Sequence, residues 1–123
     1  MKTTAILLPL ALLSSAACAS FPAPSERLAQ AESGARAANE LGAANEPTAA
    51  LYLKMANDQL GEAKRLMAAG ENERADAMLQ RAQADAELAV QLAKEAKAKA
   101  AAKAVGAQIS MLQMQNVTNG VAQ

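Results

Sequence analysis

Few residues of this chain could do chemistry. Its 123 residues include one cysteine, no histidine and no tryptophan, and twelve basic side chains balance twelve acidic ones. Without an imidazole, no side chain is set to exchange protons near neutral pH, and the single thiol lacks a base that would activate it. The carboxylates form no calcium-loop, zinc or dinucleotide-binding motif. We therefore expect a protein that is not an enzyme and that uses no metal ion and no cofactor.

The one reactive residue, Cys18, stands directly after an export signal at residues 1–17. Lys2 supplies a positive charge, residues 5–13 form an apolar run of nine, and small residues follow. The sequence Ser-Ala-Ala-Cys at residues 15–18 resembles a bacterial lipobox, although Ser15 occupies the place where leucine is usual. Ala-Cys-Ala at residues 17–19 also fits the pattern of ordinary secretion, and Cys18 would then be only a small residue near the cut. We favour lipidation of Cys18 and leave ordinary cleavage open.

Lipidation at Cys18 would decide where the protein is found. Several acyl chains of the bacterial type anchor a protein stably, at roughly 0.8 kcal/mol for each buried CH₂ group. Ala19 follows the cysteine, and the resemblance to bacterial lipoproteins implies the outer membrane, because the inner-membrane retention signal usually has aspartate there. We therefore expect the lipid bilayer as a partner, with the domain facing the periplasm; the alternative is a periplasmic or secreted protein.

The elements after the signal are expected to be helical. Residues 18–24 form a short proline-containing tether, and the apolar positions of residues 25–41 recur at helical spacing. Gly34 costs about 1 kcal/mol relative to alanine inside a helix, so this first helix is expected to be the weakest. Pro47 suits the first turn of a second helix, and Gly70 suits the left-handed position that ends it.

Residues 47–69 and a helix from residue 73 to residue 104 or beyond are expected to form an antiparallel hairpin with coiled-coil-like packing. Their apolar residues alternate at spacings of three and four, and 34 alanines in the whole chain make the rows narrow. The sequence therefore predicts an alanine-rich all-α domain over residues 25–104. The expected packing seam comprises Leu53, Ala56, Leu60, Ala63, Met67, Leu79, Ala82, Ala86, Ala89 and Ala93.

The last helix is longer than its hairpin partner, so its end is expected to overhang the bundle. The end carries Lys97, Lys99 and Lys103, and an uncharged tail of residues 105–123, expected to be partly disordered, follows. The lysines could touch an anionic membrane surface, but a basic helix end with no further role is the simpler interpretation. Nucleic acid is not expected as a partner of an exported protein. An envelope protein or a second copy of the chain is expected instead, because the core is thin.

Four segments of the sequence resemble the domain of unknown function 4398 family of small bacterial envelope lipoproteins. They are residues 51–56 (LYLKMA), 61–66 (GEAKRL), 70–76 (GENERAD) and 81–89 (RAQADAELA). The resemblance covers about residues 25–100 and implies a helical periplasmic domain, with no catalytic residue to carry over.

The chain also resembles the alanine-zipper murein lipoprotein, but Gly42, Pro47 and Gly70 interrupt the single rod of that family. Our expectation is a non-catalytic scaffold or adaptor lipoprotein of the bacterial envelope. The alternative is a peripheral membrane binder that acts through the basic end of the last helix.

Overall fold

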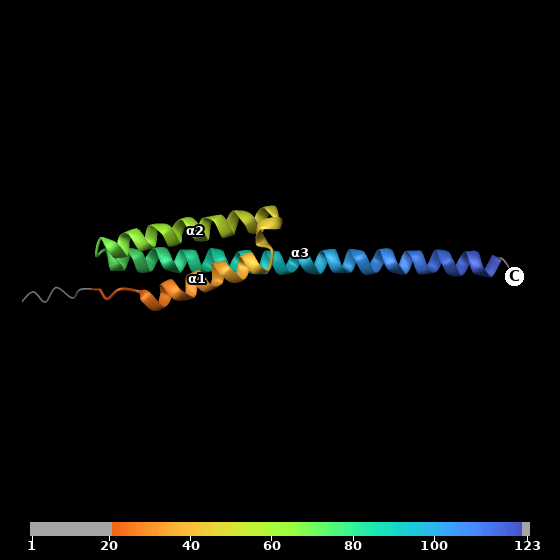
Figure 1. The fold of residues 1–123 in the computed structure, drawn as a ribbon, viewed down its shortest axis with the longest axis horizontal. Helices are drawn as coiled ribbons and strands as arrows, with labels where there is room; N and C mark the ends of the chain where they lie inside the picture. The colour runs from red at the N-terminus through yellow and green to blue at the C-terminus, as the bar shows by residue number, and fades with distance from the viewer. Residues whose placement is uncertain (1–20, 122–123) are drawn as a thin grey trace, which may run out of the picture.

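Three α-helices and one short 3₁₀ turn make up the computed structural model, which describes residues 21–121 (Figure 1). The elements are α1 (Ser25–Glu40), η1 (Ala43–Asn45), α2 (Pro47–Ala68) and α3 (Asn72–Val121). α1 and α3 run in one direction and α2 runs back between them in the sequence, which gives an up–down–up path (Figure 1). The described range contains no strand. The predicted all-α class and the α2–α3 hairpin are therefore confirmed.

The helix ends follow the local chemistry of the sequence. The Glu46 side chain caps α2 by accepting a hydrogen bond from the backbone N–H of Ala49, and Pro47 occupies the first turn. At the other end of α2, Gly70 has φ +76°, which L side chains avoid. There the N–H of Gly70 donates to the carbonyl of Met67, and the N–H of Glu71 donates to the carbonyl of Leu66. These two bonds form a Schellman motif, which ends the helix and reverses the chain.

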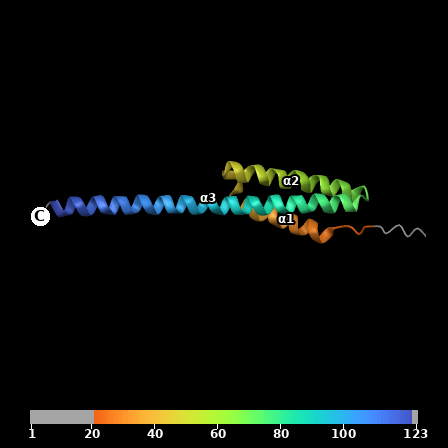
Figure 2. The same cartoon turned by 180° about the vertical axis from the view of Figure 1, so that it is seen from behind.

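The core consists of small side chains gathered along α3. α2 packs beside α3, and α1 crosses its other side, as both views show (Figures 1 and 2). Among residues 21–119, every buried residue is an alanine or a leucine, and no polar or charged residue is buried. Leu66 and Leu79 are the largest fully buried side chains. Small side chains allow helix axes to come close together, so the helices contact each other mainly through alanine methyl groups near the backbone rather than through bulky side chains.

Gly34 in α1 lies at a point of close approach between α1 and α3. A Cβ atom built on Gly34 would stand 3.2 Å from the Cβ of Ala86, which is tighter than an ordinary van der Waals contact. Ala35 and Ala38 follow on α1 and are also buried. The residue that weakens α1 as an isolated helix is thus the residue that lets α1 dock on α3.

Each pair of helices is also joined by one polar contact. Arg27 of α1 donates to Asp76 of α3 at 2.6 Å, and Lys64 of α2 pairs with Glu32 of α1 at 2.6 Å. Gln59 of α2 donates to Asp85 of α3 at 2.7 Å. Because rows of alanine look alike after a shift of one heptad, these directional contacts favour one alignment of the helices.

The expected boundary at residue 104 is not a boundary of the helix. α3 continues without a break to Val121, through most of the segment for which we expected a partly disordered tail. Gly106 lies inside the helix, where the hydroxyl of Ser110 donates to its carbonyl at 3.0 Å. The Thr118 hydroxyl likewise donates to the carbonyl of Met114 at 3.2 Å. Runs of alanine, glutamine, methionine and leucine are good helix formers, and they outweigh the single glycine.

Gly34 and Gly61 provide a matched test of the α1–α3 contact. Nothing lies within 4 Å of a Cβ built on Gly61, whereas a Cβ on Gly34 meets Ala86. Gly61→Ala should raise the free energy of unfolding by roughly 0.5–1 kcal/mol, because glycine is the poorer helix former. Gly34→Ala should fail to give this gain, and Gly34→Val should lower the stability. Thermal unfolding followed by circular dichroism measures all three, and an equal gain from Gly34→Ala and Gly61→Ala would contradict the contact.

The Arg27–Asp76 contact should make the docking of α1 sensitive to acid. The hydrogen bond from Arg27, assisted by one from Gln80, holds the pKa of the Asp76 carboxyl below its ordinary value. A depressed carboxyl pKa stabilises the fold above the unfolded-state pKa of about 4, and this contribution is lost as the pH falls through the folded-state value.

Replacing Asp76 should therefore remove part of the acid sensitivity. We expect Asp76→Asn to lower the stability at pH 7 by up to about 1 kcal/mol and to reduce the further loss on acidification to pH 3. Asp58→Asn is the control, because Asp58 pairs only with Lys54 of its own helix in the described structure. Chemical unfolding at the two pH values measures the effect; an unchanged acid response in Asp76→Asn would count against it.

Candidate interaction surface

The structure places the predicted packing seam in the hydrophobic core that α1, α2 and α3 share. Nine of its ten residues are buried, and Met67 is half-buried. Leu66, its neighbour at the end of α2, is almost fully buried at 1% exposure. The buried members are Leu53, Ala56, Leu60, Ala63, Leu79, Ala82, Ala86, Ala89 and Ala93. The seam is therefore used inside the chain and is not free to bind a partner.

The free surface of the molecule is the second half of α3, which we call the overhang and define as residues 97–121. It projects alone beyond α1 and α2 in both views (Figures 1 and 2). Every residue from Lys97 to Asn119 is exposed. At 1.5 Å per residue the overhang is about 35 Å long. Large apolar side chains that would normally be covered stand open to solvent on it, namely Val105, Ile109, Met111, Leu112, Met114 and Val117.

The outward side of α3 changes from polar to apolar where the bundle ends. Within the bundle this side carries Gln80, Glu87, Gln91 and Lys94. Eighteen residues make five turns of an α-helix, so a residue eighteen positions later lies on the same side. The residues found there are, in the same order, Ala98, Val105, Ile109 and Leu112. We did not predict this change from the sequence, although the eighteen-residue spacing is visible in it.

The three lysines of the proposed membrane contact are exposed but do not share one side of the helix. At about 100° per residue, Lys97 and Lys99 point to nearly opposite sides of α3. Lys99 also pairs with Glu95 at 2.6 Å, and this hydrogen bond lowers the pKa of Glu95 and raises that of Lys99. Lys99 and Lys103 are four residues apart and share one side of the helix, but Lys97 lies away from both, so the three lysines do not form a single cationic face.

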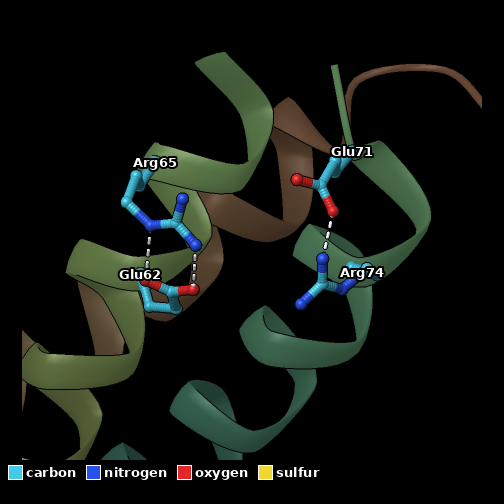
Figure 3. A network of polar contacts seen from close by, with 4 residues as sticks. All are labelled: Glu62, Arg65, Glu71 and Arg74. Carbon is cyan, nitrogen blue, oxygen red and sulfur yellow. Dashed lines mark hydrogen bonds and ion pairs between the residues drawn. The ribbon is translucent and has the colours of Figure 1, made fainter. Parts of the chain in front are cut away.

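The opposite end of the bundle carries two ion pairs. Arg65 donates two hydrogen bonds to Glu62, at 2.8 and 2.6 Å, in the last turns of α2 (Figure 3). Arg74 pairs with Glu71 at the start of α3 (Figure 3). The two pairs influence each other, because Arg74 helps to lower the pKa of Glu62. Glu73, in the first turn of α3, adds a further negative charge, so the turn between α2 and α3 presents a polar surface with no excess of positive charge.

The N-terminal tether is held beside this same turn. The side-chain amide of Asn72, the first residue of α3, donates to the carbonyl of Phe21 at 2.9 Å. Cys18 and the signal at residues 1–17 lie outside the described residues, so the structure does not bear on their predicted roles. Phe21 is three residues after Cys18, and three residues span at most about 11 Å. An anchor on Cys18 would therefore attach at the turn end of the bundle, away from the overhang.

We find no small-ligand site among residues 21–121. Between residues 21 and 121, no group of three or more candidate ligand side chains is arranged to hold a metal ion. No helix in this range is long and apolar enough to cross a membrane. A hollow of about 640 Å³ between α1 and α2 is open to solvent and includes Arg36, Asn57 and Lys64 in its lining. The overhang remains the surface with the clearest capacity to bind.

Comparison with known proteins gives one match. The family model described as a domain of unknown function, DUF4398, matches residues 26–105. Neither a curated protein nor a solved structure matches the chain. The matched region contains α1, α2 and the part of α3 that packs on them, and most of the overhang lies after it.

Binding to anionic vesicles tests the three lysines. Because they do not share one side of α3, we expect the triple replacement Lys97→Gln, Lys99→Gln and Lys103→Gln to leave vesicle binding of the unlipidated chain unchanged. The matched control replaces Lys54, Lys64 and Lys94 by glutamine, which removes the same charge elsewhere. Co-sedimentation with vesicles rich in anionic lipid measures binding. Binding that is lost only with the first triple variant would instead support the membrane-surface alternative.

Proposed function

The chain belongs to the DUF4398 family of domains of unknown function, and on that premise we propose that it is a non-catalytic scaffold or adaptor of the bacterial cell envelope. A lipid on Cys18 would hold it at the outer membrane with its helices in the periplasm. An envelope protein or a second copy of the chain would then bind at the overhang.

The observation that carries this proposal is the exposed apolar surface of the overhang. Val105, Ile109 and Leu112 are 55%, 51% and 54% exposed, although apolar residues of this size are usually covered in a stable fold. They lie on a continuous helix that the bundle supports only at its base. A helix with an open apolar side gains stability when another helix covers that side.

The position of the tether supports the proposed orientation. The contact between Asn72 and Phe21 places the start of the described chain beside the α2–α3 turn. An acyl group on Cys18 would hold this end close to the bilayer, and α3 would point its overhang away from it. At the membrane-proximal end, Glu62 and Glu71 are paired with Arg65 and Arg74, and Glu73 adds a negative charge, so attachment would depend on the lipid.

The residue types support a binding role rather than catalysis. The chain has no histidine, and its side-chain carboxylates in the interhelical contacts are engaged by Arg27, Gln59 and Lys64. These contacts join helices, and in each of them the carboxylate is occupied by a partner on another helix. Groups that hold the fold in this way contribute to stability and not to a reaction.

Mass spectrometry of the mature chain tests the anchor. We expect acyl chains on an N-terminal Cys18, and we expect Cys18→Ala to move the protein from the membrane fraction to the soluble periplasmic fraction. The Cys18→Ala chain should keep its helical circular dichroism spectrum, because residue 18 precedes the helices. An unacylated mature chain that starts after residue 18 would exclude the anchor.

Site-specific photo-crosslinking in intact envelopes tests the overhang. A photo-reactive residue at Gln113, on the overhang, should give adducts with envelope proteins or with a second copy. The same residue at Gln91, on the exposed side of α3 within the bundle, is the matched control and should give far fewer. Equal labelling at both positions, or none at Gln113, would contradict an adaptor that binds through the overhang.

A further inference from the structure

We propose that the overhang is a dimerisation helix that pairs in parallel with the overhang of a second copy of this chain. The pairing surface is one stripe of α3, which we call the outer stripe. Its residues recur at spacings of four and three and are Ala98, Ala102, Val105, Ile109, Leu112 and Asn116. This inference rests on the proposed function, in which it names the partner, and the membrane anchor adds one further reason for the common direction of the two copies.

The outer stripe has the spacing of a coiled-coil seam. Spacings of four and three place alternate residues at the two core positions of a heptad, and all six residues of the stripe are exposed. No charged residue lies in the overhang after Lys103. Two such stripes can therefore meet without placing a charge in the interface.

The residue types in the stripe favour two parallel chains. Ile109 and Asn116 occupy the first core position of the heptad, and Val105 and Leu112 occupy the second. Ile109 at the first position with Leu112 at the second fits the pattern of a parallel dimer, whereas Val105 at a second position does not contribute to it, and one asparagine at the first position fixes the alignment and the number of chains. In a parallel pair the two Asn116 amides lie level and can hydrogen-bond to each other.

The flanks of the stripe suit a copy of themselves. In a parallel pair, Gln108 of one chain lies near Gln113 of the other, and two amides can both donate and accept. Nearer the bundle, Lys99 is already paired with Glu95 of its own chain at 2.6 Å. A partner helix with strongly charged flanks would find no opposite charges along the stripe to pair with. A second copy of this chain has uncharged flanks there and needs no such pairing.

The bundle leaves the outer stripe accessible. The core residues of α3, such as Ala86 and Ala93, lie roughly 140° around the helix from the stripe, at about 100° per residue. α1 and α2 cover the core side, so a second copy can approach the outer stripe without moving them. The interface would begin where the polar residues of the same side end, between Lys94 and Ala98. Two copies anchored in one membrane would also point their overhangs the same way.

Disulfide formation tests the stripe and its direction. In the full chain carrying Cys18→Ala, the introduced cysteine is the only thiol. Val105→Cys and Leu112→Cys, made separately, should each give disulfide-linked dimers under mild oxidation, because equivalent core residues of a parallel pair lie side by side. Ser110→Cys, on another side of the overhang, should give little. An antiparallel pair can bring at most one of the two core positions beside its own copy, so a dimer from only one of them would overturn the parallel arrangement.

Analytical ultracentrifugation of the same Cys18→Ala background gives an independent measurement. Ile109→Lys should abolish the dimer, and Met114→Lys, which adds the same charge outside the stripe, should leave it intact. Circular dichroism checks that both variants stay helical. A monomeric parent chain, or equal loss with both lysines, would overturn the inference. Because this background lacks the acyl group, a dimer found together with an unacylated natural chain would keep this inference and exclude the anchor.

Discussion

Close packing of alanine methyl groups against α3 is the interaction on which the rest of the structure depends. Each alanine contributes little buried surface, but it is the best helix former and loses no side-chain freedom on folding. Rows of alanine also let α1 and α2 lie near the backbone of α3, with leucines filling the remaining space. The contact of Gly34 with Ala86 marks how little room is left between two of these helices.

Packing between rows of alanine does not strongly favour one alignment of two helices over another. The polar contacts between the helices supply that preference. A row of identical methyl groups fits nearly as well after a shift of one heptad. The Arg27–Asp76, Glu32–Lys64 and Gln59–Asp85 contacts each join a different pair of helices and would all be broken by such a shift. The connection at Gly70, two residues before α3, restricts the hairpin further.

The sequence predicts much of this fold because its signals are local. The three–four spacing, Pro47 and Gly70 identify the helices of the hairpin and their order. The role of Gly34 could not be predicted, because it depends on Ala86 in another helix, and Arg27 and Asp76 are likewise far apart in the chain. The continuation of α3 past residue 104 was left open beside an expected partly disordered tail, for a different reason: Gly106 and the pair Asn119–Gly120 are local signals against a helix, and their neighbours outweigh them. The overhang was expected from length alone, but its apolar side became clear only after the face covered by the bundle was known.

The uninterrupted course of α3 fixes the distance between the two ends of the described chain. Its 50 residues correspond to about 75 Å from base to tip. In a single helix, one inserted residue raises the tip by 1.5 Å and also turns it by about 100°, so distance and direction cannot be altered separately. Seven inserted residues would lengthen the helix by about 10 Å and would leave the side chains of the tip pointing in almost the same directions as before.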